Sequence, residues 1–421
     1  MIRVIAGIAL VVAVVAVVAA LVTRGSSDSG PAPLGSLPRT SAPLPHRDTS
    51  LARPWVTIRN GSFVDASDTP VVLRGYDVAV GTPAYRQAAG LGANFVRVHI
   101  GWSQVEPQAP TGPDDSVHHW DQTILSDLDQ EVAYFQQQHV NVLIDFHQFR
   151  WSPWWSKVDC KPGTSCNATG VPAWYYKGRY GQDAASLARA KAAFWTTEAK
   201  PSSTLYGAFA AMMARRYGHY PNVMGYEVFN EPHAGTLGDD TAATNTMLAW
   251  QGRIARVLHA VDPSRAVVVM CRGGGEGIGT ANLRLLGSLH HVALDFHDYY
   301  NGKPNTGFDA AGDNWTPSWP ATHNQVTPGP YTGSEQAQSA VLSVPVDRAR
   351  RWGIPLIVGE WGIHTDTPEA AVYQQQMLSL FDRDDVSWAR WQLASGSGFG
   401  LLVHGGQPTP LVEQLSQALK P

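Results

Sequence analysis

Ionisable, amide and aromatic side chains recur in this sequence within, or directly after, short apolar runs of strand length. A lone histidine in such a place is an ordinary structural hydrogen-bond donor, and a lone glutamate is an ordinary helix-start charge. Similar groups at five or six successive strand ends are hard to explain by packing, and they suggest one shared site. The groups are Arg97 with His99, His147, Asn230 with Glu231, His297 with Tyr299, Glu360, and Trp391.

Two of these residues, Glu231 and Glu360, form a natural pair for glycoside hydrolysis. The retaining form of that reaction needs two carboxyl groups about 5–5.5 Å apart, one as nucleophile and one as acid/base. The neighbouring side chains suit the same chemistry, because each can bind the sugar or one of the carboxylates. We expect Asn230 at the sugar 2-hydroxyl, Arg97 and Tyr299 at Glu360, His297 at Glu231, and Trp391 under the sugar ring.

Eight apolar runs are available to position these groups. Most are continuous rather than alternating, which is typical of strands buried on both faces of a parallel sheet. Helical patterns lie between them, as in the face formed by Ile124, Leu128 and Val132. The order predicts an α/β fold, a (β/α)8 TIM barrel in one catalytic domain, because a doubly wound sheet would need an early glycine-rich phosphate turn. The runs are Val71–Gly75, Phe95–Ile100, Val140–Phe146, Val223–Phe229, Ala266–Met270, Val292–Phe296, Pro355–Val358 and Ser387–Trp391.

Two connections are much longer than the others, one after the third run and one around the sixth. Barrel active sites are built from the loops that follow the strands, so we expect these insertions to form the walls of a cleft. Both are rich in tryptophan, which can stack on sugar rings. The first carries Trp151, Trp154, Trp155, Trp174 and Trp195, and the second carries Trp315 and Trp319.

Seven segments in order resemble glycoside hydrolase family 5, the cellulase-like retaining β-glycosidases with a clan A type barrel. The resemblance implies Glu231 as acid/base and Glu360 as nucleophile, with Arg97, His147, Asn230, His297, Tyr299 and Trp391 around them, and it implies no metal or organic cofactor. A general acid must hold its proton near the working pH, so we expect a raised pKa for Glu231. The segments are LRGYD at 73–77, NFVRVHIGW at 94–102, LIDFHQ at 143–148, GYEVFNEP at 225–232, DFHDYY at 295–300, LIVGEWG at 356–362 and WARWQ at 388–392.

The segment after the third run is similar to the endoglycoceramidase-like branch of that family, which separates an oligosaccharide from ceramide. GVPAWYY and AFWTTEA carry this similarity. That branch has an acidic residue after its His-Gln pair, where this chain has Phe149, and its members usually carry a C-terminal β-sandwich. The expected substrate is therefore a polysaccharide, a glycoconjugate or a glycolipid, with the loops deciding which.

The N-terminal residues 1–24 read as a signal peptide or a membrane anchor. Val4 to Val22 carry no charge and lie between Arg3 and Arg24, and a run of that length can span a bilayer. Residues 25–54 have the Pro, Ser and Gly content of a disordered linker. The catalytic domain is expected over 55–421, beginning with a hairpin at Asn60-Gly61. The protein is accordingly expected outside the cytosol, secreted or anchored by this segment.

The chain has 3 cysteines. Cys160 and Cys166 lie close together in a Gly/Pro-rich stretch, and we interpret them as a loop disulfide that suits an extracytoplasmic protein. No further Cys or His stands near at ligand spacing, so a metal site is not favoured there. Cys271 ends an apolar run and is expected to be a buried free thiol.

Composition limits the remaining classes. With 44% hydrophobic and 16% charged residues the chain is not disordered, and a net charge of −4 without a basic block does not favour nucleic acid as a partner. A non-catalytic sugar-binding barrel stays as an alternative, although it would be expected to have lost a glutamate. A metal-dependent barrel hydrolase would want a His-x-His pair on the first strand, and Arg74–Asp77 has none.

Overall fold

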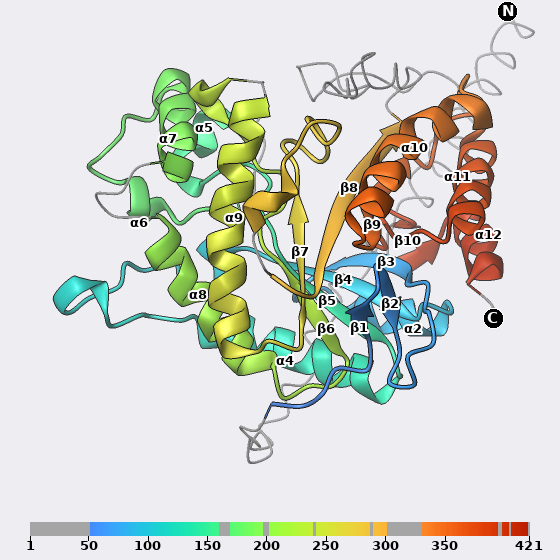
Figure 1. Ribbon diagram of the computed structural model, residues 1–421, viewed down its shortest axis with the longest axis horizontal. Helices are drawn as coiled ribbons and strands as arrows, with labels where there is room; N and C mark the ends of the chain where they lie inside the picture. The colour runs from blue at the N-terminus through green and yellow to red at the C-terminus, as the bar shows by residue number, and fades with distance from the viewer. Residues whose placement is uncertain are drawn as a thin grey trace, which may run out of the picture. The chain divides into compact units, whose positions relative to one another are not determined.

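The computed structural model describes residues 51–159, 169–196, 202–238, 241–286, 289–300, 331–394, 398–403 and 406–419. The chain divides into two units, 1–47 and 48–421, and all described residues belong to the second. Eight parallel strands close into a barrel, in the order β10-β3-β4-β5-β6-β7-β8-β9 (Figure 1). The predicted (β/α)8 barrel is therefore confirmed.

The barrel strands coincide with the eight apolar runs, with one shift at the start. The run at Val71 begins three residues before its strand. Val71 N–H instead donates to Phe63 O at 2.9 Å, and Leu73 packs in the apolar cluster that contains Phe63. The sixth and seventh strands continue past their apolar runs into the polar residues that follow. The strands are β3 (Arg74–Ala79), β4 (Phe95–Ile100), β5 (Asn141–Phe146), β6 (Val223–Glu227), β7 (Ala266–Met270), β8 (Val292–Tyr300), β9 (Leu356–Ile363) and β10 (Ser387–Arg390).

Helices cover the outside of the barrel, and each buries one apolar face. In α4 (Gln122–Gln137) that face includes Leu125, Leu128 and Val132, and the helix begins where the Asp121 carboxylate accepts from the Thr123 N–H at 2.8 Å. The other long helices are α7 (Ala184–Thr196), α8 (Ser202–Tyr217), α9 (Thr241–Val261), α10 (Glu335–Trp352), α11 (Ala370–Asp384) and α12 (Pro410–Ala418). Shorter ones are α2 (Tyr85–Gly90), α3 (Trp102–Val105), α5 (Ser156–Asp159) and α6 (Ala173–Tyr176), with 3-10 turns η1 (Pro113–Asp115), η2 (Pro153–Trp155), η3 (Gly235–Leu237) and η4 (Leu283–Leu286).

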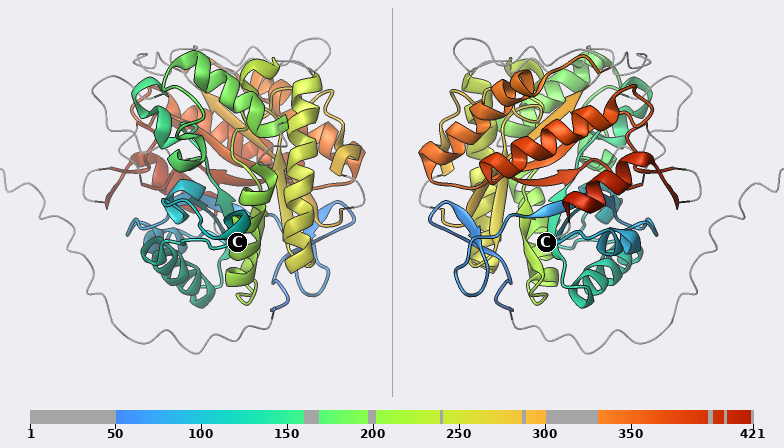
Figure 2. Two further views of the ribbon diagram at one scale, coloured as in Figure 1. Left: turned by 90° about the vertical axis from the view of Figure 1, so that its left-hand side faces the viewer. Right: turned by 90° about the vertical axis from the view of Figure 1, so that its right-hand side faces the viewer.

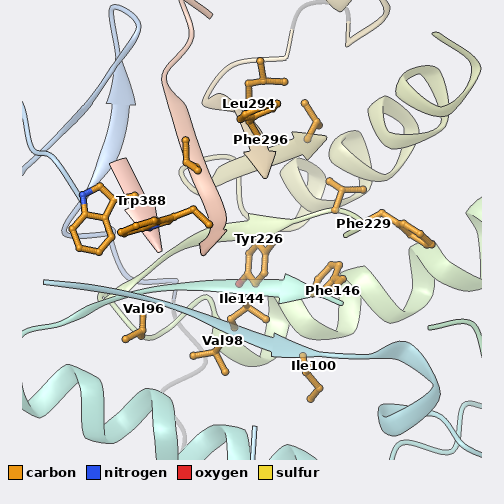
Figure 3. Close-up of a cluster of buried hydrophobic side chains, with 14 of the residues drawn as sticks. Val96, Val98, Ile100, Ile144, Phe146, Tyr226, Phe229, Leu294, Phe296 and Trp388 are labelled. Atoms are coloured by element: carbon orange, nitrogen blue, oxygen red, sulfur yellow. The ribbon is translucent and has the colours of Figure 1, made fainter. Parts of the chain in front are cut away.

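Alternation along each strand separates the helix-facing core from the barrel interior. On β4, Val96, Val98 and Ile100 point to the same side of the strand and pack in the core that the helices share (Figure 3). Phe95, on the other face, belongs to a separate apolar cluster inside the barrel. Arg97 and His99 share the phase of Phe95, so β4 directs two polar groups into the interior.

A hairpin packs against the apolar cluster inside the barrel, as predicted at Asn60-Gly61. Strands β1 (Thr57–Arg59) and β2 (Ser62–Val64) are antiparallel, and the turn has φ of 50° at Asn60 and 79° at Gly61. Both angles are left-handed, which suits Asn-Gly in a two-residue hairpin loop. Val56, Ile58 and Phe63 join the inner cluster with Leu73 and Phe95. Figure 2 shows the hairpin at the end of the barrel opposite to α7.

Three of the five tryptophans of the first insertion are buried rather than on a cleft wall, which corrects the expectation for these three. Trp151, Trp155 and Trp195 have at most 1% exposure. Trp151 and Trp195 pack edge to face on each other, and Trp195 packs on Trp250 at a centroid distance of 5.1 Å. Trp155 packs on Tyr176 and Tyr180. Trp154 is partly buried against the same core, as is Trp174. A long connection needs a core of its own, and aromatic residues provide it.

Several predictions fall outside the described residues. These are the N-terminal segment with its linker through residue 50, the Cys160–Cys166 disulfide, and the second insertion with Trp315 and Trp319. Within the described ranges, none of the helices combines the length and the apolarity that a membrane span requires. Cys271 is a buried free thiol, as expected, and burial raises its pKa to about 12. A final short ribbon pairs β11 (Leu402–Val403) with β12 (Gln407–Pro408).

Candidate active site

The polar residues predicted from the strand ends meet inside the carboxyl end of the barrel. Arg97 lies on β4, His297 and Tyr299 lie on β8, and Glu360 lies on β9. Asn230 and Glu231 follow β6, His147 follows β5, and Trp391 follows β10. The carboxyl ends of parallel strands share one rim, so residues spread over the whole chain become neighbours.

Arg97 is the centre of the cluster and has no solvent exposure. Its guanidinium donates from Nε to Oε2 of Glu227 at 2.7 Å and from Nη1 to Oδ1 of Asp77 at 2.8 Å. Nη1 also donates to Oε1 of Glu360 at 2.9 Å, and Nη2 lies 3.0 Å from Oδ2 of Asp145. One cation therefore serves four carboxylates, and its planar fork of donors suits that task better than a lysine would.

Three of these carboxylates were not predicted as site residues. Asp77 and Asp145 lie within strands, and Glu227 ends one. All three have no solvent exposure. Burial raises the pKa of Asp77 and of Glu227 well above the usual range, although the charge of Arg97 opposes the rise. Their acidic side chains in the same phase as Arg97 were the available signal, because inward positions on neighbouring strands meet.

Glu360 accepts hydrogen bonds on both carboxylate oxygens. The Tyr299 hydroxyl donates to Oε2 at 2.7 Å, and Arg97 donates to Oε1. Burial and the negative charge of Glu360 raise the pKa of Tyr299 well above its ordinary value, so the phenol remains a donor. These contacts orient the Glu360 carboxylate and give each of its oxygens a hydrogen-bond donor, as an ionised carboxylate requires.

Glu231 lies beside His297, whose Nδ1 is 2.9 Å from Oε1 of Glu231 and 3.3 Å from Oε2 of Glu360. One oxygen of Glu231 and one of Glu360 lie within 4.8 Å of each other. Glu231 has a φ of 39°, a left-handed value that few non-glycine residues adopt, and a side chain 20% exposed against 5% for Glu360. Of the two glutamates, Glu231 is therefore the one that solvent reaches more readily.

The pKa of Glu231 lies below its ordinary value, which corrects the expectation of a raised one. Burial raises it, but the hydrogen bond from His297 and the charges of nearby histidines outweigh burial. His297 itself has a pKa raised well above its usual value, because Glu360, Asp295 and Glu231 outweigh the effect of burial. Glu231 therefore gives up its proton more readily than an ordinary glutamate, and His297 keeps its proton more readily than an ordinary histidine.

Three rings from β4 and from the residues after β5 and β10 lie against one another. His147 and Trp391 lie nearly parallel, with ring centroids 5.7 Å apart and an interplanar angle of 12°. His99 lies within 5.2 Å of both rings by centroid distance, and His147 Nδ1 is 2.6 Å from Oδ2 of Asp145. Burial lowers the pKa of His99 well below its ordinary value, so the stack includes a neutral imidazole.

Asn230 is anchored from both ends of its amide. Its Oδ1 accepts from Nη2 of Arg97 at 2.7 Å, and its Nδ2 donates to the backbone oxygen of Gln148 at 2.9 Å. The Gln148 side chain in turn donates to the backbone oxygens of Asn230 and Glu231, at 2.9 and 2.6 Å. Gln148 was not predicted as a site residue, yet it fixes the chain that carries Glu231.

Among the described residues, two sets of side chains bring possible metal ligands together: Glu227 with Asp295 and His297, and Glu231 with His297 and Glu360. Nitrogen and carboxylate oxygen are donors that zinc accepts. The members of both sets already bond to Arg97, to Tyr299 or to one another. Those contacts account for their proximity.

The chain matches the family model described as Cellulase (glycosyl hydrolase family 5) over residues 64–397. No curated protein matches the chain. Among solved structures, it is similar to an endogalactoceramidase, with a TM-score of 0.65, 20% identity, and coverage of 87% of this chain and 84% of that one.

A complex of endo-glycoceramidase II from Rhodococcus sp. with a cellobiose-like imidazole gives a TM-score of 0.64 at 22% identity, over 84% of this chain and 80% of that one. A β-glucanase from Saccharophagus degradans gives 0.58 at 14% identity, over 90% of this chain and 97% of that one. At these identities the structural matches establish the barrel fold.

Proposed function

This chain belongs to the cellulase family of glycosyl hydrolases, family 5, and is a glycosidase; from that premise we propose that it cleaves β-glycosidic bonds with retention of configuration. Glu360 is the nucleophile and Glu231 the acid/base. The observation that carries the proposal is the approach of one oxygen of each glutamate to within 4.8 Å. Retaining enzymes hold their carboxyl groups about 5–5.5 Å apart, and inverting enzymes about 6.5–9.5 Å, to admit a water.

The first half of the reaction forms a glycosyl-enzyme. A carboxylate oxygen of Glu360 bonds to the anomeric carbon while the glycosidic bond breaks and Glu231 gives a proton to the leaving oxygen. Tyr299 and Arg97 hold the attacking carboxylate in place. Trp391 offers its face to the sugar ring at the point of cleavage.

The second half releases the sugar. Glu231, now without its proton, removes a proton from a water whose oxygen attacks the anomeric carbon, and the bond to Glu360 breaks. Two inversions restore the β configuration. A non-catalytic sugar-binding barrel would not need this paired arrangement, and both glutamates are present with their partners.

We propose an oligosaccharide as glycone, from a glycan or a glycoconjugate. A second candidate is release of the oligosaccharide from a glycolipid, as in the endoglycoceramidase-like branch. The likeness to the endogalactoceramidase and to endo-glycoceramidase II favours it, since one structure of the latter is described as a ganglioside GM3 complex. The likeness to a β-glucanase keeps the polysaccharide candidate.

A mechanism-based label tests the proposal. The full chain is incubated with 2-deoxy-2-fluoro β-glucoside, cellobioside and lactoside reagents, and its peptides are analysed by mass spectrometry. We expect one covalent sugar on the peptide that holds Glu360, and none in a Glu360→Gln control. A label on another carboxylate would reassign the nucleophile, and folded protein that none of the reagents labels would favour a binding barrel.

We propose an extracytoplasmic location for the enzyme, secreted or anchored through residues 1–24. The apolar run from Val4 to Val22 supports this. Fractionation of cells that express the full chain tests it. Activity in the cytosolic fraction alone would contradict it.

A further inference from the structure

Asp295 is a fully buried carboxylate two residues before His297 on β8. Its Oδ1 accepts two backbone N–H groups, from Phe296 at 2.6 Å and from Gly359 at 2.7 Å. Its Oδ2 accepts no hydrogen bond from any described residue and lies 3.6 Å from Nε2 of His297. The backbone bonds fix the carboxylate, and they aim the second oxygen at the imidazole ring.

The His297 ring has a carboxylate at each nitrogen. Nδ1 faces Glu231 and Glu360 on one side, and Nε2 faces Asp295 on the other. The side chain is 1% exposed, and its backbone N–H donates to Gly274 O at 2.8 Å. A neutral imidazole has one N–H and one bare nitrogen, so it would turn the bare nitrogen to a carboxylate. Protons on both nitrogens satisfy both sides.

The charged groups around this ring are mostly negative. Glu227 from β6 brings an oxygen within 4.8 Å of a ring nitrogen and of Asp295. Arg97 from β4 is the opposing cation, and its Nε lies 2.7 Å from Glu227 and 3.9 Å from Oδ2 of Asp295. The nearby His147 and His233 also act on Glu231 and lower its pKa. Because Arg97 is shared among several carboxylates, negative charge remains beside His297 that a positive charge on its ring can balance.

We propose that Asp295 is a positioning residue that keeps His297 protonated on both nitrogens, so that His297 holds the proton which Glu231 delivers to the leaving group. The inference rests on the proposed function and explains how a Glu231 with a lowered pKa acts as an acid. The direction of the His297 pKa, raised by Glu360, Asp295 and Glu231 against burial, agrees with it.

The proton step balances without any added reactant. The Nδ1 proton of His297 passes to Oε1 of Glu231 across 2.9 Å, which leaves a neutral ring with its remaining proton on Nε2, facing Asp295. Glu231 then protonates the glycosidic oxygen as the bond to the anomeric carbon breaks and Glu360 bonds to that carbon. In the second half, the proton that Glu231 takes from water returns to Nδ1.

Nitrogen NMR on the wild-type full chain tests the protonation directly. The ring signals of His297 are identified by their absence from a His297→Gln variant. At about pH 8, where an ordinary histidine is neutral, we expect the two nearly equal ¹⁵N shifts of an imidazolium. Two widely separated shifts at that pH would overturn the proposal, and this readout does not depend on the substrate.

Asp295→Asn tests the positioning role. The asparagine oxygen can still accept the two backbone N–H groups, while its NH2 faces Nε2 of His297 and removes the charge. We expect kcat/KM for a substrate with a poor leaving group to fall about 10²-fold or more, because general acid catalysis is lost. A dinitrophenyl glycoside leaves without a proton, so its glycosylation step should change by less than about threefold.

The pH profile gives a second readout from the same variant. Removing the Asp295 charge lowers the pKa of His297, so the basic limb for the poor leaving group should move down by about one pH unit or more. Asp298→Asn is the matched control, since Asp298 is an equally buried acid on the outward phase of the same strand. In that control the basic limb should stay in place.

Three outcomes would overturn the inference. They are an unchanged basic limb in folded Asp295→Asn, an equal loss on both substrates, and the same shift in Asp298→Asn. If Asp295→Asn does not fold, the nitrogen shifts of wild-type His297 decide the question. Wild-type protein that hydrolyses neither substrate would count against the proposed function, while those shifts still decide the protonation of His297.

Discussion

Nη1 of Arg97 donates a 2.9 Å hydrogen bond to Oε1 of Glu360, and the Arg97 guanidinium is fully buried. The same guanidinium binds Glu227 and Asp77 in the barrel interior. The proposed nucleophile is therefore held by a group that also neutralises buried acids of the fold. Stability and catalysis share this residue, so a change at Arg97 must affect both.

Arg97→Lys should reduce both stability and activity. A lysine keeps the charge but offers one ammonium in place of a planar fork, so at least one buried acid loses its partner. Breaking a buried ion pair costs about 3–5 kcal/mol, and we expect a loss of that order in the free energy of unfolding. Urea denaturation at constant temperature measures it.

Arg350→Lys provides the control for that measurement. Arg350 pairs with Asp384 at 3.4 Å, and its side chain is 60% exposed. An exposed pair contributes about 0–1 kcal/mol, so the unfolding midpoint should hardly move. Similar losses in both variants would mean that the buried network does not carry the stability assigned to it.

Glu360→Ala should abolish turnover of the natural linkage, on the order of 10⁴-fold or more, because a nucleophile cannot be replaced by its neighbours. Added azide fits the space of the lost carboxylate and should attack an activated β-glycoside from the same face. The product should then be an α-glycosyl azide, identified by proton NMR. Full activity without azide would remove Glu360 from its role.

Much of this site is readable in the sequence, because polar residues at the ends of continuous apolar runs stand out. Glu231 and Glu360 were found in this way, and Arg97, which lies inside its run, was assigned through its expected contact with Glu360. Asp77 and Glu227 were not, because an acid inside a strand reads as an exposed position until the barrel register shows that it faces Arg97. The missing information is three-dimensional, since strands far apart in the chain decide which inward positions meet.

The predictions about the first insertion's tryptophans and about the pKa of Glu231 were wrong for related reasons. Ring content does not distinguish an interior from a sugar-binding surface, and Trp151 packs against Phe194 and Trp195 in the interior. The direction of the Glu231 pKa depends on which nitrogen of His297 approaches it and on what lies behind that ring. Neither the packing of the tryptophans nor the surroundings of the His297 ring can be seen in the spacing of residues along the sequence.

Trp391→Ala should weaken binding of the sugar at the point of cleavage. Loss of an aromatic face that a sugar covers costs about 1–3 kcal/mol, so kcat/KM should fall by about 5–150-fold. Trp391→Phe keeps a flat ring and should recover part of the loss. Unchanged kinetics in Trp391→Ala, on a substrate that the wild type hydrolyses, would place the sugar elsewhere on the barrel rim.

Glu131 makes the stability of the protein depend on pH. It lies on α4 with 1% exposure, and its Oε1 accepts from the Gly81 N–H at 2.7 Å. Burial raises its pKa to about 8, and the charge of Asp127 adds to the rise. Between pH 4.5, its ordinary pKa, and about 8, the unfolded chain has lost this proton while the folded chain keeps it. Folding therefore becomes less favourable as the pH rises through that window.

Glu131→Gln should remove this dependence. The glutamine oxygen can accept from Gly81 as the acid does, and no proton is needed to keep the side chain neutral. At about pH 4 the variant and the wild type should unfold at similar urea concentrations, and by about pH 8 the variant should be more stable by on the order of 4 kcal/mol. Asp127→Asn lowers the pKa of Glu131 and should give a smaller gain of the same sign. A stability difference that stays constant from about pH 4 to about pH 8 would mean that Glu131 is charged in the folded protein.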